Sequence, residues 1–140
     1  MTETTTEFES NQPVNPSLSI GWIEVTGGQQ LRYDEFVRKL FKLNAACGDL
    51  MHAAIGICGE AGELGDAIKK HVVYNKELDR TNVIEELGDL RFYMQAMQNL
   101  LGITEQEILQ HNACKLMVRY ENLEYSDKAA QARADKVDGK

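Results

Sequence analysis

Two stretches of the chain repeat apolar residues at alternating steps of about three and four, and this pattern constrains the fold more than any other feature. Such spacing places the residues along one side of an amphipathic α-helix that packs against other helices. The stretches are Leu50, Ala54, Ile57, Ala61, Leu64, Ile68, Val72 and Val83, Leu87, Leu90, Met94, Met97, Leu101. The sequence therefore predicts an all-α protein with two long helices packed against each other.

Each apolar stretch also carries two carboxylates three residues apart. Glu60 and Glu63 form the first pair, and Glu86 and Asp89 form the second. On a helix, residues i and i+3 share a face, with Cβ atoms about 5–6 Å apart. All four acids come directly before a residue of the apolar stripe, so each pair lies on the same flank of its helix. We expect the two pairs to face a common point.

Four carboxylates at one point repel one another unless a cation is present. Two of them about 5 Å apart repel by about 3 kcal/mol at an effective dielectric near 20. Oxygen-only ligands suit Mg²⁺ or Mn²⁺, which commonly bind carboxylates and substrate phosphates together. The alternative is that all four are ordinary solvated helix charges. The matched positions of the pairs favour a metal site that holds the phosphates of a nucleotide.

Composition narrows the class of protein further. The 140 residues suit one domain, and the net charge of -7 argues against a nucleic-acid groove, whose signature is a basic face. The three cysteines, Cys47, Cys58 and Cys114, have no C-x-x-C spacing, which is typical of reduced thiols. No stretch has the layout of a signal peptide or a membrane span. We expect a cytoplasmic protein with no membrane or nucleic-acid partner.

The remaining elements follow from composition and capping signals. Residues 1–30 are polar with scattered Pro and Gly, which predicts a partly extended arm; within it, Trp22 packs on a helix or a neighbouring subunit, or covers a base. Residues 31–125 form the helical domain, with helices expected at 34–43, at 49–74, from about 82 to 101 and from 105 onward. Thr104 and Glu107 form a capping box. Residues 126–140 form a charged tail.

The last of these helices has a polar flank of its own. Asn112, Lys115 and Arg119 each come directly before a stripe residue, which aligns two cations and an amide. Arg binds phosphate through its bidentate fork and Lys binds it as a point charge. The alternative is a basic last turn that complements the helix dipole. Beside the acid pairs, contact with phosphate is the favoured interpretation.

Three motifs in this order resemble the MazG-like all-α nucleoside triphosphate pyrophosphohydrolase superfamily. They are G-E-A-G-E-L at 59–64, E-E-L-G-D-L at 85–90 and N-x-x-K-L-x-x-R-Y at 112–120. The resemblance covers roughly residues 33–125. It implies an antiparallel bundle of about four helices and a reaction in which a nucleoside triphosphate and water give a nucleoside monophosphate and pyrophosphate. One departure is Gly59, which stands where the wider pattern often has a further acid.

The resemblance also implies roles for individual residues. The Mg²⁺ ligands would be Glu60, Glu63, Glu86 and Asp89, with Mn²⁺ as a substitute ion. Lys115 and Arg119 would bind phosphate with help from Asn112, and Tyr93 would lie near the substrate. A carboxylate of the cluster, Glu63 or Glu60, would accept the proton of the attacking water.

Two other classes of protein also gather long helices. A di-iron carboxylate bundle needs Glu-x-x-His motifs, which the sequence does not contain. A non-catalytic helical interaction module would use the same apolar stripes but has no need of matched acids and cations. Stripes of this length predict a core completed by oligomerisation, as a homodimer or homotetramer.

Overall fold

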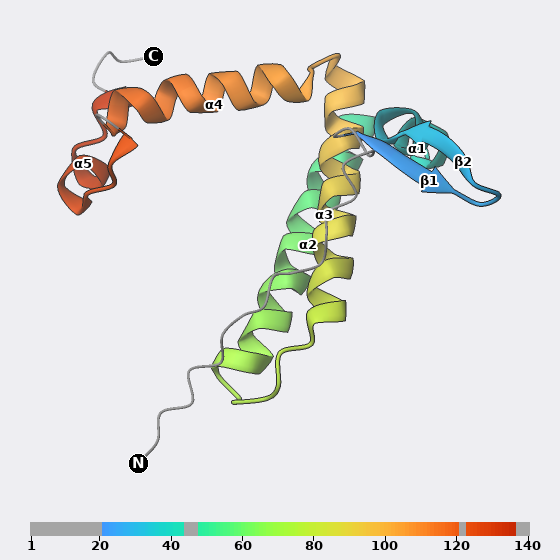
Figure 1. Cartoon of the computed structure of the whole chain (residues 1–140), viewed down its shortest axis with the longest axis horizontal. Coiled ribbons are helices and arrows are strands. Elements are labelled where there is room, and N and C mark those ends of the chain that lie inside the picture. The colour runs from blue at the N-terminus through green and yellow to red at the C-terminus, as the bar shows by residue number, and fades with distance from the viewer. Residues whose placement is uncertain (1–20, 44–47, 121–122, 137–140) are drawn as a thin grey trace.

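The computed structural model describes residues 21–43, 48–120 and 123–136, and most of them are helical. Two long helices, α2 and α3, lie side by side, and α4 leaves the end of α3 and runs away from the pair (Figure 1). The elements are β1 (Trp22–Val25), β2 (Gln29–Arg32), α1 (Tyr33–Leu40), α2 (Asp49–Val72), α3 (Arg80–Leu101), α4 (Glu105–Arg119), α5 (Asp127–Ala132) and the 3₁₀ helix η2 (Ala134–Lys136). The predicted all-α class is confirmed.

The ends of α3 are fixed by local chemistry. Its N-cap is Asp79, whose side chain accepts a hydrogen bond from the backbone N–H of Asn82 at 3.0 Å. The helix therefore begins slightly earlier than predicted. At its other end Gly102 adopts φ 66, a left-handed conformation that glycine takes without a Cβ clash, and the helix stops there as expected.

The core lies where α1 packs against the upper part of the long helix pair. Val37, Ala53 and Ala96 are its fully buried members. Aromatic and long aliphatic side chains surround them, namely Tyr33, Phe36, Phe41, Phe92, Met97 and Leu100. Small residues on α2 let α3 approach closely, because a Cβ on Gly56 would clash with the ring of Tyr93.

A short β-hairpin precedes α1. Its strands pair antiparallel from Trp22 opposite Arg32 to Val25 opposite Gln29, and Gly27 and Gly28 form the turn with positive φ values. The arm predicted for residues 1–30 thus has an extended part, although residues 1–20 lie outside the described residues. The boundaries of the arm, the domain and the tail remain predictions. The helix expected at 34–43 runs instead from Tyr33 to Leu40.

The chain after α3 forms a separate limb. The predicted capping box is present, since Thr104 accepts from the backbone N–H of Glu107 and the Glu107 carboxylate accepts from the backbone N–H of Thr104. Beyond α4, the tail folds back through η2 and places Asp135 against Arg119. Within one chain, α4 therefore does not complete a four-helix bundle.

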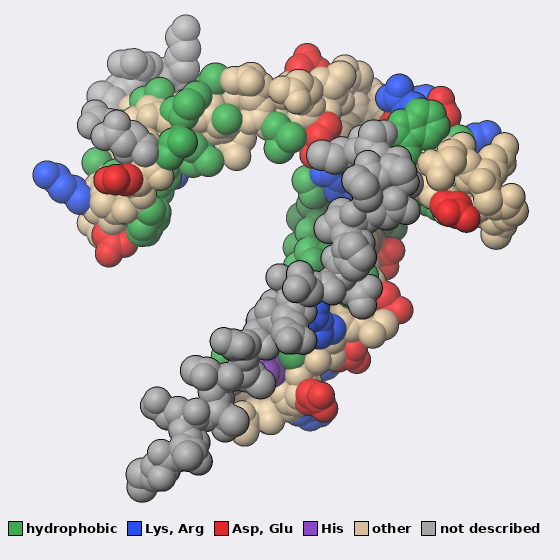
Figure 2. Space-filling view, in the orientation of Figure 1, with side chains coloured by type: hydrophobic (Ala, Val, Ile, Leu, Met, Phe, Trp, Pro, Cys, Tyr) green, Lys and Arg blue, Asp and Glu red, His purple; other side chains and the backbone are tan. Residues whose placement is uncertain are grey.

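Much apolar surface remains uncovered in a single chain. Leu109 and Val118 on α4 are 54% and 60% exposed, and Leu87 on α3 is 49% exposed. Figure 2 shows hydrophobic side chains along α4 on the face seen there. Among the described residues, no helix combines the length and the apolar character needed to cross a bilayer.

Candidate functional site

The structure brings three of the four predicted acids together. Glu60 and Glu63 on α2 and Glu86 on α3 each offer a carboxylate oxygen, and these atoms lie within 4.8 Å of one another. Glu60 and Glu86 are half-buried, and Glu63 is exposed. We call these three residues the acid cluster. Their convergence follows from the sequence pattern, because matched flanks of two packed helices face each other.

Asp89 lies beside the acid cluster and acts on it electrostatically. The pKa of Glu60 is raised above its usual 4.5, first by burial and then by the charges of Asp89, Glu63 and Glu86. Asp89 contributes more to this shift than either of the other two acids does. All four predicted carboxylates therefore contribute to one negative potential.

The cluster has the chemistry and the size that a hard divalent cation requires. Its ligands are carboxylate oxygens, which suit Mg²⁺ and Mn²⁺. The three oxygens lie within 4.8 Å of one another, close enough for a single ion to be held between them. The residues present thus fit a bound metal ion.

Asn82 supports the site, although the sequence pattern gave it no role there. Its Nδ2 donates to Oε1 of Glu86 at 3.2 Å from one turn earlier on α3. This contact orients the carboxylate of Glu86. The signal in the sequence was the spacing of four residues between an amide and a carboxylate on one helix.

A small pocket adjoins Asn82 at the connector between α2 and α3. It has a volume of about 230 Å³, and Lys70, Lys76, Glu77 and Asp79 line it with Asn82 and Ala67. Lys70 also pairs with Asp66 at 3.0 Å. The pKa of Lys70 is raised mainly by Asp66 and to a smaller extent by Glu86, so its ammonium group interacts with the acid cluster of its own chain, a feature that the sequence pattern did not predict.

Tyr93 lies one turn after Asp89 and belongs to an aromatic group between the helices. Its ring packs on Gly56, and it meets Phe41 and His52 edge to face, with ring centroids 6.5 and 6.0 Å away. His52 stacks on Phe41 with centroids 4.7 Å apart, and its Nδ1 is buried without a hydrogen-bond partner. Tyr93 is therefore held in a packed aromatic group between α2 and α3, one turn of α3 beyond Asp89.

The predicted phosphate-binding residues are not near the acid cluster within one chain. α4 is tied to α3 at Glu105, which contacts Arg91 and Gln98. From there, Lys115 lies about 15 Å and Arg119 about 21 Å along a helix that leads away, at a rise of about 1.5 Å per residue. Asn112 and Lys115 are exposed.

Arg119 already holds a carboxylate. Its Nε and NH2 donate to the two oxygens of Asp135 at 2.7 and 2.8 Å, in a bidentate pair. This pair lowers the pKa of Asp135 to about 2 and raises that of Arg119, in each case mainly through the hydrogen bonds between them. The guanidinium thus has the fork geometry that suits phosphate, and the tail of the same chain occupies it.

Comparison with known protein families decides the affiliation of the chain. A family model described as the MazG nucleotide pyrophosphohydrolase domain matches residues 51–123, more than half of the sequence. The chain belongs to this family. The MazG match begins inside α2 and extends past the end of α4, so it includes the acid cluster, Asp89 and the cations of α4.

The MazG match leaves out the β-hairpin and α1. Comparisons with curated proteins and with solved structures found no match. Family membership assigns nucleotide pyrophosphohydrolase chemistry to the helical core and leaves the choice of nucleotide open.

Proposed function

We propose that the protein is a Mg²⁺-dependent nucleoside triphosphate pyrophosphohydrolase. It would cleave an NTP or dNTP to the corresponding monophosphate and pyrophosphate. The observation that supports this best is the convergence of Glu60, Glu63 and Glu86 from two helices in a chain of the MazG family. Mn²⁺ is the expected substitute ion.

The four acids would hold the metal and handle the proton of the attacking water. A bound Mg²⁺ neutralises charge on phosphate oxygens and lowers the pKa of water. Glu63 is exposed, so its carboxylate is reachable by water and suits the role of general base, which Glu60 shares as the alternative. Asn82 would keep Glu86 oriented, and Tyr93, one turn after Asp89, would lie near the substrate.

We further propose that a second copy of the chain completes the site. Lys115, Arg119 and Asn112 would contact the phosphates, yet α4 carries them away from the acids of its own chain. In a homodimer or homotetramer, α4 can reach the acids of a neighbour and bury its apolar residues at the same time. Lys70 and Lys76, at the connector, would assist from within the chain.

The test of this function is product analysis with a panel of NTPs and dNTPs, with and without Mg²⁺. We expect at least one nucleotide to yield equimolar monophosphate and pyrophosphate, and we expect EDTA to abolish the reaction. Release of single phosphates, or no turnover with any nucleotide in Mg²⁺ or Mn²⁺, would contradict the proposal.

Variants of the acids connect the activity to the site. Glu63→Gln and Asp89→Asn should each lower kcat by at least about a hundredfold, since each removes a charge that the reaction needs. Glu35→Gln is the matched control, because Glu35 is an exposed acid on α1 that does not belong to the acid cluster. Equal losses in all three variants would point to a general charge effect and not to the cluster.

A further inference from the structure

A larger pocket lies at the other end of the long helix pair. Its volume is about 740 Å³, within the range of about 300–1,000 Å³ that small-molecule sites occupy. The walls come from the β-hairpin, α1, the second half of α3 and the start of α4. We call it the arginine pocket, after the lining residues Arg32, Arg38 and Arg91.

The arginine pocket is separate from the acid cluster. Arg91, Gln95 and Gln98 line it from one side of α3. At about 100° per residue, Glu86, Asp89 and Tyr93 lie on the opposite side of the same helix. The hairpin and α1 contribute nearly half of the lining residues and lie outside the stretch that matches the MazG family. The family match therefore includes the walls from α3 and α4 but leaves out the walls from the hairpin and α1.

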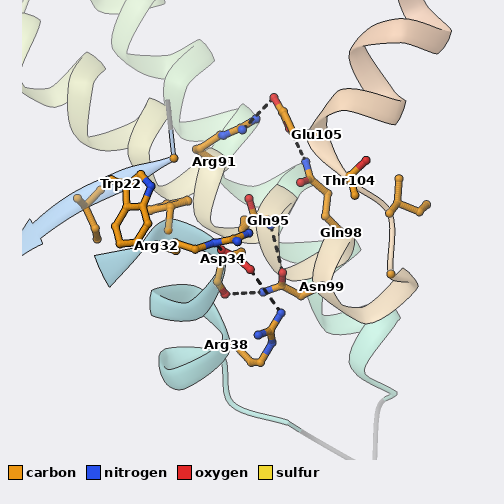
Figure 3. Close-up of a pocket in the computed structure, with 15 residues that line it drawn as sticks. Trp22, Arg32, Asp34, Arg38, Arg91, Gln95, Gln98, Asn99, Thr104 and Glu105 are labelled. Carbon is orange, nitrogen blue, oxygen red and sulfur yellow. Dashed lines mark hydrogen bonds and ion pairs between the residues drawn. The ribbon is translucent and has the colours of Figure 1, made fainter. Parts of the chain in front are cut away.

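The charge in the pocket has the opposite sign to that of the chain. Three arginines and two carboxylates, Asp34 and Glu105, line it, which leaves a net charge of +1 in a chain of -7. Figure 3 shows Arg32 and Arg38 around Asp34, and Arg91 reaching toward Glu105. An excess cation in a concave site attracts anions.

The arginines keep hydrogen-bond donors available for a ligand. Their ion pairs use one nitrogen each, at 2.9 Å for Arg32, 3.6 Å for Arg38 and 2.9 Å for Arg91. Each guanidinium carries five N–H donors in a planar fork that matches phosphate oxygens. The three side chains are 57%, 62% and 40% exposed, so a ligand can reach them.

Other polar contacts hold the pocket in shape before any ligand arrives. Asn99 donates to the backbone carbonyl of Asp34 at 2.9 Å, which ties α3 to the start of α1. Gln95 donates to Asn99 at 3.1 Å, and Gln98 donates to Glu105 at 2.9 Å, which ties α3 to α4. A pocket built from such fixed groups loses little freedom on binding.

An aromatic surface lies beside the cations. Trp22 is 44% exposed, and it pairs directly across the hairpin with Arg32, so the two side chains share one face of the strands. Figure 3 shows the indole next to Arg32. An exposed indole can stack on a planar ring while the arginines hold an anionic group.

We propose that the arginine pocket is a second ligand site, which binds a phosphate ester that carries a planar ring, with a nucleoside monophosphate as the simplest example. The phosphate contacts Arg32 and Arg38, and the ring stacks on Trp22. The proposal does not depend on the reaction at the acid cluster, because the phosphate and the ring would contact residues of β1, β2 and α1, and none of these residues belongs to the acid cluster.

Trp22 itself provides the measurement, since it is the only tryptophan in the chain. Indole fluorescence is followed while AMP, adenosine or inorganic phosphate is added to the full chain in EDTA, which keeps divalent metal from the acid cluster. We expect a saturable change with AMP and at least tenfold weaker binding of adenosine and of phosphate. No saturable change with AMP, or equal binding of phosphate and AMP, would overturn the proposal.

Matched variants locate the binding. Arg38→Gln and Arg32→Gln should each weaken AMP binding about tenfold, because each removes a charge-assisted hydrogen bond. Lys39→Gln makes the same change of charge at the next residue of α1, which does not line the pocket, and should bind as the wild type does. Glu63→Gln should also leave AMP binding unchanged. Binding that is equally weak in the Lys39 variant, or unchanged in both arginine variants, would refute the assignment.

Discussion

Glu60 shows most clearly the electrostatic cost of placing four carboxylates close together. Its carboxylate is half-buried and is surrounded by the charges of Asp89, Glu63 and Glu86, and its pKa is raised. The folded protein therefore holds a proton on Glu60 more tightly than the unfolded chain does. Without a cation, ionised Glu60 opposes folding.

This predicts a pH dependence of stability in the metal-free protein. Between the ordinary pKa of 4.5 and the raised value in the fold, the folded state binds more protons, so stability should fall as the pH rises through this window. Glu60→Gln removes the titrating group and should be more stable than the wild type at neutral pH in EDTA, although inactive. Thermal unfolding at a series of pH values measures both effects. A variant less stable than the wild type at neutral pH would contradict this account.

Asn82 gives a second prediction at this scale. Asn82→Ala removes the hydrogen bond to Oε1 of Glu86, and loss of such a supporting contact typically weakens metal binding by about 10–100-fold. Titration with Mn²⁺, followed by calorimetry, measures the change. Thr81→Ala alters the neighbouring exposed residue of the same turn and should bind Mn²⁺ as the wild type does. Equal affinities in the two variants would exclude a supporting role for Asn82.

The sequence predicted the positions of the acids better than it predicted their supports. Periodicity alone places Glu60, Glu63 and Glu86 on facing flanks, since that depends only on helix geometry. The contact from Asn82 depends on which residue caps α3, and Asp79 takes that role. The pair between Arg119 and Asp135 depends on how the tail folds back, which no helical repeat encodes.

At the scale of elements, the contact between α2 and α3 sets the distance between the acid pairs. Gly56 lets the ring of Tyr93 lie directly on α2, about one turn from Glu60. Gly65, on the same helix, has no atom within 4 Å of an added Cβ. The two glycines therefore have opposite roles in one helix.

Substitution of the two glycines by alanine tests this difference. Gly56→Ala forces Tyr93 to move and should lower the free energy of unfolding by about 1–3 kcal/mol, as overpacking does. Gly65→Ala relieves only the entropic cost of glycine in a helix and should raise the free energy of unfolding by about 0.5–1 kcal/mol. Denaturant unfolding of both variants measures the changes. Equal effects would show that Tyr93 does not pack on Gly56.

The helices followed from the sequence, whereas the hairpin and the course of α4 did not. Long stripes and a capping box define α2, α3 and α4 locally. The strands β1 and β2 have four residues each, too few for alternation to be distinguished from a polar arm. The direction of α4 depends on packing beyond its first turn. An apolar stripe shows which face of a helix is buried, but it does not show which element packs against that face.

At the scale of the whole molecule, the apolar surface of α4 predicts self-association. Leu109 and Val118 are more than half exposed in one chain, and burial of such side chains contributes about 1.5–3 kcal/mol each. We expect light scattering to give the mass of a dimer or tetramer, and the double variant Leu109→Gln with Val118→Gln to shift it toward the monomer. Gln106→Ala, on the same helix, should keep the wild-type mass. A monomeric wild type would refute the prediction.

Because α4 extends away from the acids of its own chain, two inactive variants should rescue each other. Glu63→Gln inactivates only the acid cluster that a chain contributes to a site, and Lys115→Ala inactivates only the α4 residues that it contributes. In a mixed dimer, one of the two sites then has both an unchanged acid cluster and an unchanged α4. About half of the dimers formed by random mixing are mixed, so about a quarter of wild-type turnover should return. If α4 instead contributed to the site of its own chain, the mixture would stay inactive. The activity of a mixture of the two inactive variants therefore shows whether α4 acts in its own chain or in the partner.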